Sequence, residues 1–200
     1  MHHKPLVAVT LTAIAFLFAC KKGNDDCKPG HDNTLRYRSL NDEQVKNLRS
    51  LHLDIDEDGT HEIYLALGVS GGAEGMRGKF FAAGINNAKL LVKSDSTICL
   101  EPNEAIHAIA PHPRDWKGME SYLVEAFIPA ATPDDTVWTG NWLGASRKYM
   151  GVQFSKGGVP YMGWVCVSMD RTSLALIMHG CAWRRLQEGE LPAGKMPGTN

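Results

Sequence analysis

Apolar and other side chains alternate along Ile63-Tyr64-Leu65-Ala66-Leu67-Gly68-Val69. The large aliphatic residues recur at every second position, which is the period of a β-strand with one buried face, whereas a helix buries a face with a period of about 3.6. Similar short segments follow at 79–85, 89–93, 121–127, 148–154, 161–168 and 173–179, separated by Gly, Pro and Asn-Asn turn signals. This spacing predicts an all-β fold, and we expect a jelly-roll-like β-sandwich.

A second segment, Tyr161-Met162-Gly163-Trp164-Val165-Cys166-Val167, has no charged residue on either face. Both faces of this strand are therefore expected to be covered, with Trp164 in the core. Residues 159–179 predict a hairpin that turns at 169–172. Residues 41–53 fit either a helix or a strand. The glycine-rich residues 68–79 lack the spacing of a phosphate-binding loop, so we expect a flexible loop between strands.

The composition is that of an ordinary globular protein, with 200 residues, 44% hydrophobic and 22% charged. This length favours a single domain. Lys+Arg number 21 and Asp+Glu number 22, for a net charge of −1. Because no basic excess exists to neutralise phosphates, we expect no nucleic-acid partner.

The N-terminus has the pattern of a secretory signal peptide over residues 1–19, with Lys4 before an apolar run at 6–18. Leu17-Phe18-Ala19-Cys20 resembles the lipobox of bacterial lipoproteins, although Phe18 replaces the usual small residue. The resemblance implies acylation of Cys20 and a lipid anchor in the outer membrane. Residues 20–34 hold almost nothing that could enter a core, so we expect a polar, flexible tether there and a single β-domain at 35–200. The alternative is an ordinary signal peptide with a chance cysteine.

The remaining cysteines are Cys27, Cys99, Cys166 and Cys181. In an oxidising compartment these four residues permit three disulfide pairings, and no spacing selects among them. Cys166 and Cys181 lie in or beside apolar runs, so a second interpretation is that they are buried free thiols.

The strongest local motif is Asp54-Ile55-Asp56-Glu57-Asp58-Gly59-Thr60-His61-Glu62. Carboxylates at alternate positions before a glycine converge where the backbone curls, which suits calcium. The candidate ligands are the side chains of Asp54, Asp56, Asp58 and Glu62 and the Thr60 carbonyl. Leu65 stands where an EF-hand needs its bidentate Glu, so this is not an EF-hand. The alternative is an acidic Asx-turn without a metal ion.

Further motifs follow the acidic loop in a fixed order. They are Gly140-Asn141-Trp142, Tyr149-Met150-Gly151-Val152-Gln153-Phe154, Tyr161-Met162-Gly163-Trp164-Val165 and Ala193-Gly194. With the loop they resemble a family of functionally uncharacterised secreted or lipid-anchored proteins of Gram-negative bacteria. The resemblance covers 54–194 and implies a β-fold and an envelope location, but no activity. The end of the chain departs from the family pattern at residues 179–183.

Candidate ligand-binding residues are the tryptophans in or beside loops, Trp116, Trp138 and Trp142. An exposed indole stacks on sugars or partner proteins, whereas a buried one fills the core, the alternative for Trp142. We therefore expect a non-enzymatic module that binds a glycan or an envelope protein. The alternative is a polysaccharide hydrolase, but no spacing singles out a pair among Glu120, Glu125, Asp134 and Asp135. His179 and Cys181 lack a second pair of metal ligands and are interpreted as a hairpin end.

Overall fold

The computed structural model describes residues 35–46, 49–186 and 189–198. The predicted signal peptide, Cys20, Cys27 and the tether lie outside the described residues. The described part is all-β, as predicted, and its one helical element is the short 3-10 helix η1 (Pro133–Asp135). The strands are β1 (Arg36–Val45), β2 (Leu51–Leu53), β3 (Ile63–Gly72), β4 (Gly75–Gly84), β5 (Lys89–Lys93), β6 (Ser96–Thr97), β7 (Ala105–His107), β8 (Arg114–Lys117), β9 (Ser121–Pro129), β10 (Val137–Thr139), β11 (Lys148–Lys156), β12 (Val159–Asp170), β13 (Ala175–Arg185) and β14 (Glu190–Pro192).

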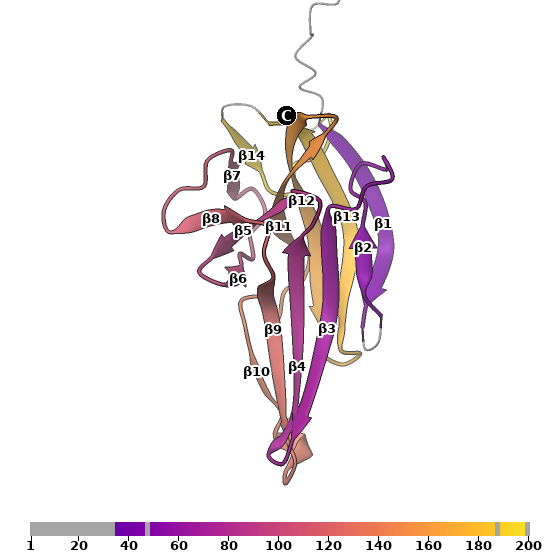
Figure 1. The fold of residues 1–200 in the computed structure, drawn as a ribbon, viewed down its shortest axis with the longest axis vertical. Coiled ribbons are helices and arrows are strands. Elements are labelled where there is room, and N and C mark those ends of the chain that lie inside the picture. Colours follow the sequence, from indigo (N-terminus) through magenta and orange to yellow (C-terminus); the bar gives the residue numbers. More distant parts are fainter. Residues whose placement is uncertain (1–34, 47–48, 187–188, 199–200) are drawn as a thin grey trace, which may run out of the picture. The chain divides into compact units, whose positions relative to one another are not determined.

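One large sheet contains most of these strands (Figure 1). Its order is β1-β13-β12-β11-β5-β6-β9-β4-β3-β2, with β10 paired to β9 and β8 paired to β5. The pairings are antiparallel except for β6 with β9. The two-stranded sheet β7–β14 is separate.

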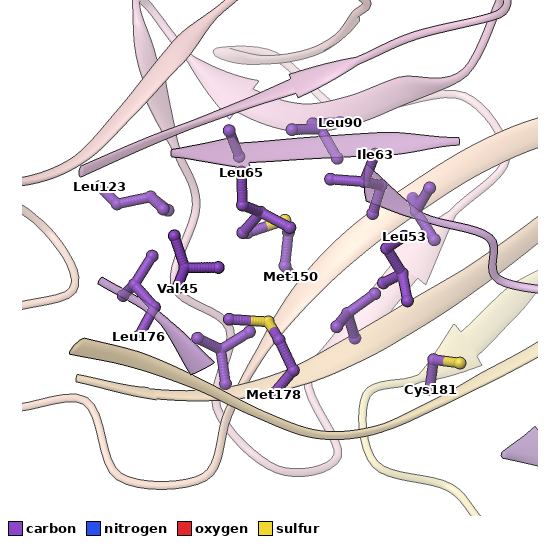
Figure 2. Close-up of a cluster of buried hydrophobic side chains, with 14 of the residues drawn as sticks. Val45, Leu53, Ile63, Leu65, Leu90, Leu123, Met150, Leu176, Met178 and Cys181 are labelled. Atoms are coloured by element: carbon purple, nitrogen blue, oxygen red, sulfur yellow. The ribbon is translucent and has the colours of Figure 1, made fainter. Parts of the chain in front are cut away.

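The main hydrophobic core collects residues from both ends of the large sheet. Val45 of β1 and Leu53 of β2 belong to the same buried cluster as Met150 of β11 (Figure 2). The Arg38 guanidinium of β1 also donates to the Asp54 carbonyl just after β2. Since strands at opposite ends of the order enclose one core, the sheet curls over on itself, which is the sandwich or barrel class that the strand pattern predicts.

A second core covers the other face of β11, β12 and β13. Trp164 and Cys166 of β12 pack there with Ile106 of β7 and Leu191 of β14, whereas Val165 and Val167 point into the main core. The predicted alternation along β12 and the burial of Trp164 are therefore confirmed. Coverage on both faces explains why this strand has no charged side chain between 161 and 167.

The glycine-rich segment forms a paired hairpin, which corrects the prediction of a flexible loop. β3 and β4 pair without interruption from Ile63↔Gly84 to Gly72↔Gly75. Gly75 has a φ of +145°, and a Cβ there would lie 2.1 Å from the Ile128 carbonyl oxygen of β9. The glycine is needed because the β9 backbone passes this close to the turn.

Residues 41–53 take the strand alternative, since β1 and β2 cover most of this segment. The predicted hairpin also forms, between β12 and β13, with its turn at 171–174, two residues later than expected. Among the described residues, no helix is both long and apolar enough to cross a bilayer.

Candidate functional site

The acidic loop connects β2 to β3 and is held by its own side chains. Asp54 accepts the backbone N–H groups of Asp58 and Gly59, at 3.3 and 2.8 Å, and Asp58 accepts that of Thr60 at 2.8 Å. Gly59 has a φ of +89°, which permits the sharp turn. These contacts are those of an Asx-turn, and they also aim several carboxylates at one point.

Four carboxyl groups meet there, those of Asp54, Asp56, Asp58 and Glu62, with one oxygen of each within 4.8 Å of the others. This cluster could hold a metal ion. The Asp56 side chain is only 1% exposed, and neither of its oxygens accepts a hydrogen bond of good geometry. The Lys156 ammonium of β11 lies 3.0 Å from Asp56 Oδ2 and is the nearby cation. Asp56 Oδ1 is thus a buried anionic oxygen without a hydrogen-bond donor.

Glu62 is also enclosed, at 3% exposed. Its Oε2 accepts the Ile55 backbone N–H at 2.7 Å. Burial raises the pKa of Glu62 to about 7, and the negative charges of Asp56, Asp54 and Asp58 raise it further against the lowering effect of the Ile55 amide. The cluster therefore carries unfavourable negative charge that a bound cation would relieve.

Comparison with known proteins does not identify a relative. The chain matches no protein-family model, and no curated protein or solved structure is significantly similar to it. The arrangement of its own side chains must therefore carry the functional argument.

The three candidate tryptophans occupy different environments. Trp142 is fully buried in the main core, where its Nε1 donates to the Thr97 carbonyl at 3.1 Å. This burial corrects its assignment as a ligand-binding residue, because a ring enclosed on all sides cannot stack on a ligand. Trp116 is half-buried on β8 and donates its Nε1 to the His107 carbonyl at 3.2 Å.

Trp138 is half-buried on β10 and lines an apolar pocket of about 110 Å³. Leu174, in the turn between β12 and β13, also lines this pocket. The pocket thus lies between the β3–β4–β9–β10 strands and this turn. Its other lining residues are Leu67, Val69, Met76, Arg77, Gly78, Phe80, Ala126 and Ile128.

The carboxylates considered for glycoside hydrolysis gain no support as a catalytic pair. Glu125 forms ion pairs with Arg77 at 2.7 Å and Lys79 at 3.1 Å. The hydrogen bond from Arg77 is the main cause that lowers the pKa of Glu125. A carboxyl group held ionised in this way cannot act as the general acid that protonates a leaving group.

A constellation that sequence reasoning missed lies on β1, β12 and β13. His179 Nε2 lies 2.7 Å from Ser168 Oγ, and His179 Nδ1 lies 2.5 Å from Asp42 Oδ1. The order Ser–His–Asp is therefore present in space. The sequence pattern pairs His179 only with its neighbour Cys181, because Asp42 lies 137 residues away along the chain.

The described cysteines are Cys99, Cys166 and Cys181, and all three are free thiols. Burial of Cys166 and Cys181 agrees with the free-thiol interpretation. Burial also raises the pKa of Cys181 to about 12, so this thiol stays protonated and unreactive.

Proposed function

We propose that this protein is a lipid-anchored binding module of the bacterial outer membrane that takes an apolar side chain from an extended segment of a partner protein. The observation that carries the proposal is the apolar pocket beside Trp138. Val69 and Met76 line it as exposed apolar residues. Contiguous exposed apolar side chains of this kind mark interaction sites.

The size and chemistry of the pocket favour a protein over a glycan. A cavity of roughly 150 Å³ holds a benzene molecule, so 110 Å³ accommodates one apolar side chain. A sugar ring needs polar partners for its hydroxyl groups, whereas the lining here is almost entirely aliphatic and aromatic.

The neighbouring strand supports an extended partner segment. β10 pairs with β9, and in the described part of the chain no strand pairs with its other edge. An extended peptide that adds to this edge can place one side chain in the adjacent pocket, which is recognition by β-strand addition. Leu174 also keeps a φ of +50°, unfavourable for leucine, at the pocket wall.

Site-specific photo-crosslinking in cells of the native host tests this surface. A photo-reactive residue at Met76, which lines the pocket and is 50% exposed, is expected to give a discrete protease-sensitive adduct. The matched control is Ile109, which is apolar and 87% exposed but does not line the pocket.

The pocket itself is tested by Leu174→Asp in the same crosslinking background. Aspartate tolerates the left-handed backbone better than leucine, so the fold should persist while the apolar wall is lost. The adduct at Met76 should disappear. A protease-resistant adduct would indicate a glycan partner, and equal adducts at Met76 and Ile109, or none, would refute this surface.

The lipid anchor is proposed from the N-terminal pattern alone. Two or three acyl chains on Cys20 would hold the protein on a membrane, since each buried CH₂ contributes about 0.8 kcal/mol. Cys20→Ala is therefore expected to abolish acylation and membrane association. Metabolic labelling with a fatty acid, followed by membrane fractionation, compares mutant and wild type, and a wild-type chain without label would end the lipoprotein interpretation.

For the acidic loop we propose calcium, which prefers six to eight oxygen ligands. Asp54, Asp56, Asp58 and Glu62 would supply carboxylate oxygens, and Thr60 would add its carbonyl. The buried Asp56 Oδ1 without a donor supports this assignment. Lys156 would have to withdraw from Asp56 when calcium binds, because two cations cannot share that carboxylate closely.

A further inference from the structure

We infer that Ser168, His179 and Asp42 form a catalytic triad that hydrolyses short-chain carboxylic esters. This activity is separate from the proposed binding surface, whose lining contains none of the three residues. The inference rests on hydrogen bonds that run from a hydroxyl through both nitrogens of one imidazole to a carboxylate.

The direction of these hydrogen bonds is set by their neighbours. The Arg147 backbone N–H donates to Ser168 Oγ at 2.9 Å, which leaves the hydroxyl hydrogen of Ser168 available for His179 Nε2. The Asp42 carboxylate accepts the Nδ1–H of His179 at 2.5 Å. His179 is thereby held in the tautomer whose Nε2 can accept a proton, which a general base for a serine nucleophile requires.

The backbone around the triad is irregular. The β1–β13 register shifts between Ser39 and Glu43, and Asp42 within this shift has a φ of +56°. The β12–β13 register also shifts, between Cys166 and Val167, next to Ser168. Arg147, whose amide contacts Ser168, has a φ of +49°. Bulges and left-handed residues that redirect side chains gather at functional sites.

Exposure bears on the class of substrate. The His179 side chain is 12% exposed, that of Asp42 is 63% exposed, and Ser168 is half-buried, so solvent reaches the triad. An open site of this kind suits an ester with a small acyl group.

In the reaction, Ser168 Oγ bonds to the ester carbonyl carbon while its proton passes to His179 Nε2, and an electron pair moves onto the carbonyl oxygen. When that pair returns, the carbon–alkoxy bond breaks and the leaving alcohol takes the proton from Nε2. Water then attacks the acyl-serine in the same way, which releases the carboxylic acid and restores Ser168. No metal ion or other reactant is needed.

The decisive experiment uses the full chain, purified in detergent, with a fluorophosphonate as probe of a reactive serine. Peptide mass spectrometry is expected to find the phosphonyl group on Ser168. Labelling confined to other residues, or no labelling, overturns the triad, and this result requires no variant to fold.

Hydrolysis of 4-nitrophenyl acetate gives the second measurement. Ser168→Ala and His179→Ala should each lower the rate at least about 100-fold. Asp42→Asn should also lower it, because its amide would donate to Nδ1 and leave Nε2 protonated. Ser173→Ala is the matched control, since Ser173 contacts Asp170 at 2.6 Å and should leave the rate unchanged. A Ser168→Ala variant that retains the wild-type rate overturns the inference.

Discussion

Replacing Trp164 with alanine is expected to destabilise the domain by about 3–5 kcal/mol. The indole is 2% exposed in the second core, where the Tyr149 ring meets it edge-on with centroids 5.1 Å apart. Its removal leaves a cavity beneath β7 and β14, which the surrounding strands cannot fill by relaxation. At roughly 2–4 °C per kcal/mol for a domain of this size, the melting temperature should fall by about 6–20 °C.

Thermal unfolding followed by circular dichroism measures this effect, with Trp164→Phe as the matched control. The Trp164 Nε1 has no hydrogen-bond partner, so phenylalanine loses some volume but also removes a buried unsatisfied donor. We expect a much smaller loss for Trp164→Phe. If Trp164→Ala folds and melts within a few degrees of wild type, the second core does not enclose this side chain.

Calcium is expected to raise the melting temperature by mass action. At a hundredfold excess over Kd the gain in unfolding free energy is about 2.7 kcal/mol, or about 5–10 °C. Asp56→Asn should abolish the gain, because it removes the charge of the buried carboxylate while keeping its shape. Melting curves in calcium and in chelator measure both proteins, and magnesium serves as a control cation because it demands a smaller octahedral site.

Removing the Lys156 ammonium tests the same loop, with stability changes of opposite sign expected in chelator and in calcium. Lys156→Met keeps the aliphatic stem but removes the ammonium 3.0 Å from Asp56 Oδ2. In chelator this variant should be less stable than wild type, because the cluster loses its cation. In calcium it should gain more than wild type, because the ion no longer competes with the ammonium. If neither protein responds to calcium, Lys156 is the permanent counter-ion and the loop is an Asx-turn.

The strands can be predicted from the sequence because their pattern depends on local chemistry. Residues that alternate with period two can bury one face only as strands, so 63–69 predicted β3, and the uncharged faces of 161–167 predicted a covered β12. The convergence of Asp54, Asp56 and Asp58 can be predicted for a similar reason, since these residues lie within one short turn that Gly59 permits.

Register and packing between distant strands decided the rest. Trp138 and Trp142 lie four residues apart, yet Trp138 packs at the margin of the main core and lines a pocket, whereas Trp142 is a fully buried member of that core. Lys156 reaches Asp56 from β11, far along the chain from the acidic loop. Asp42 and Ser168 meet at His179 because two register shifts turn their side chains toward it. Such contacts depend on which strands become neighbours, and no local period of the sequence encodes that choice.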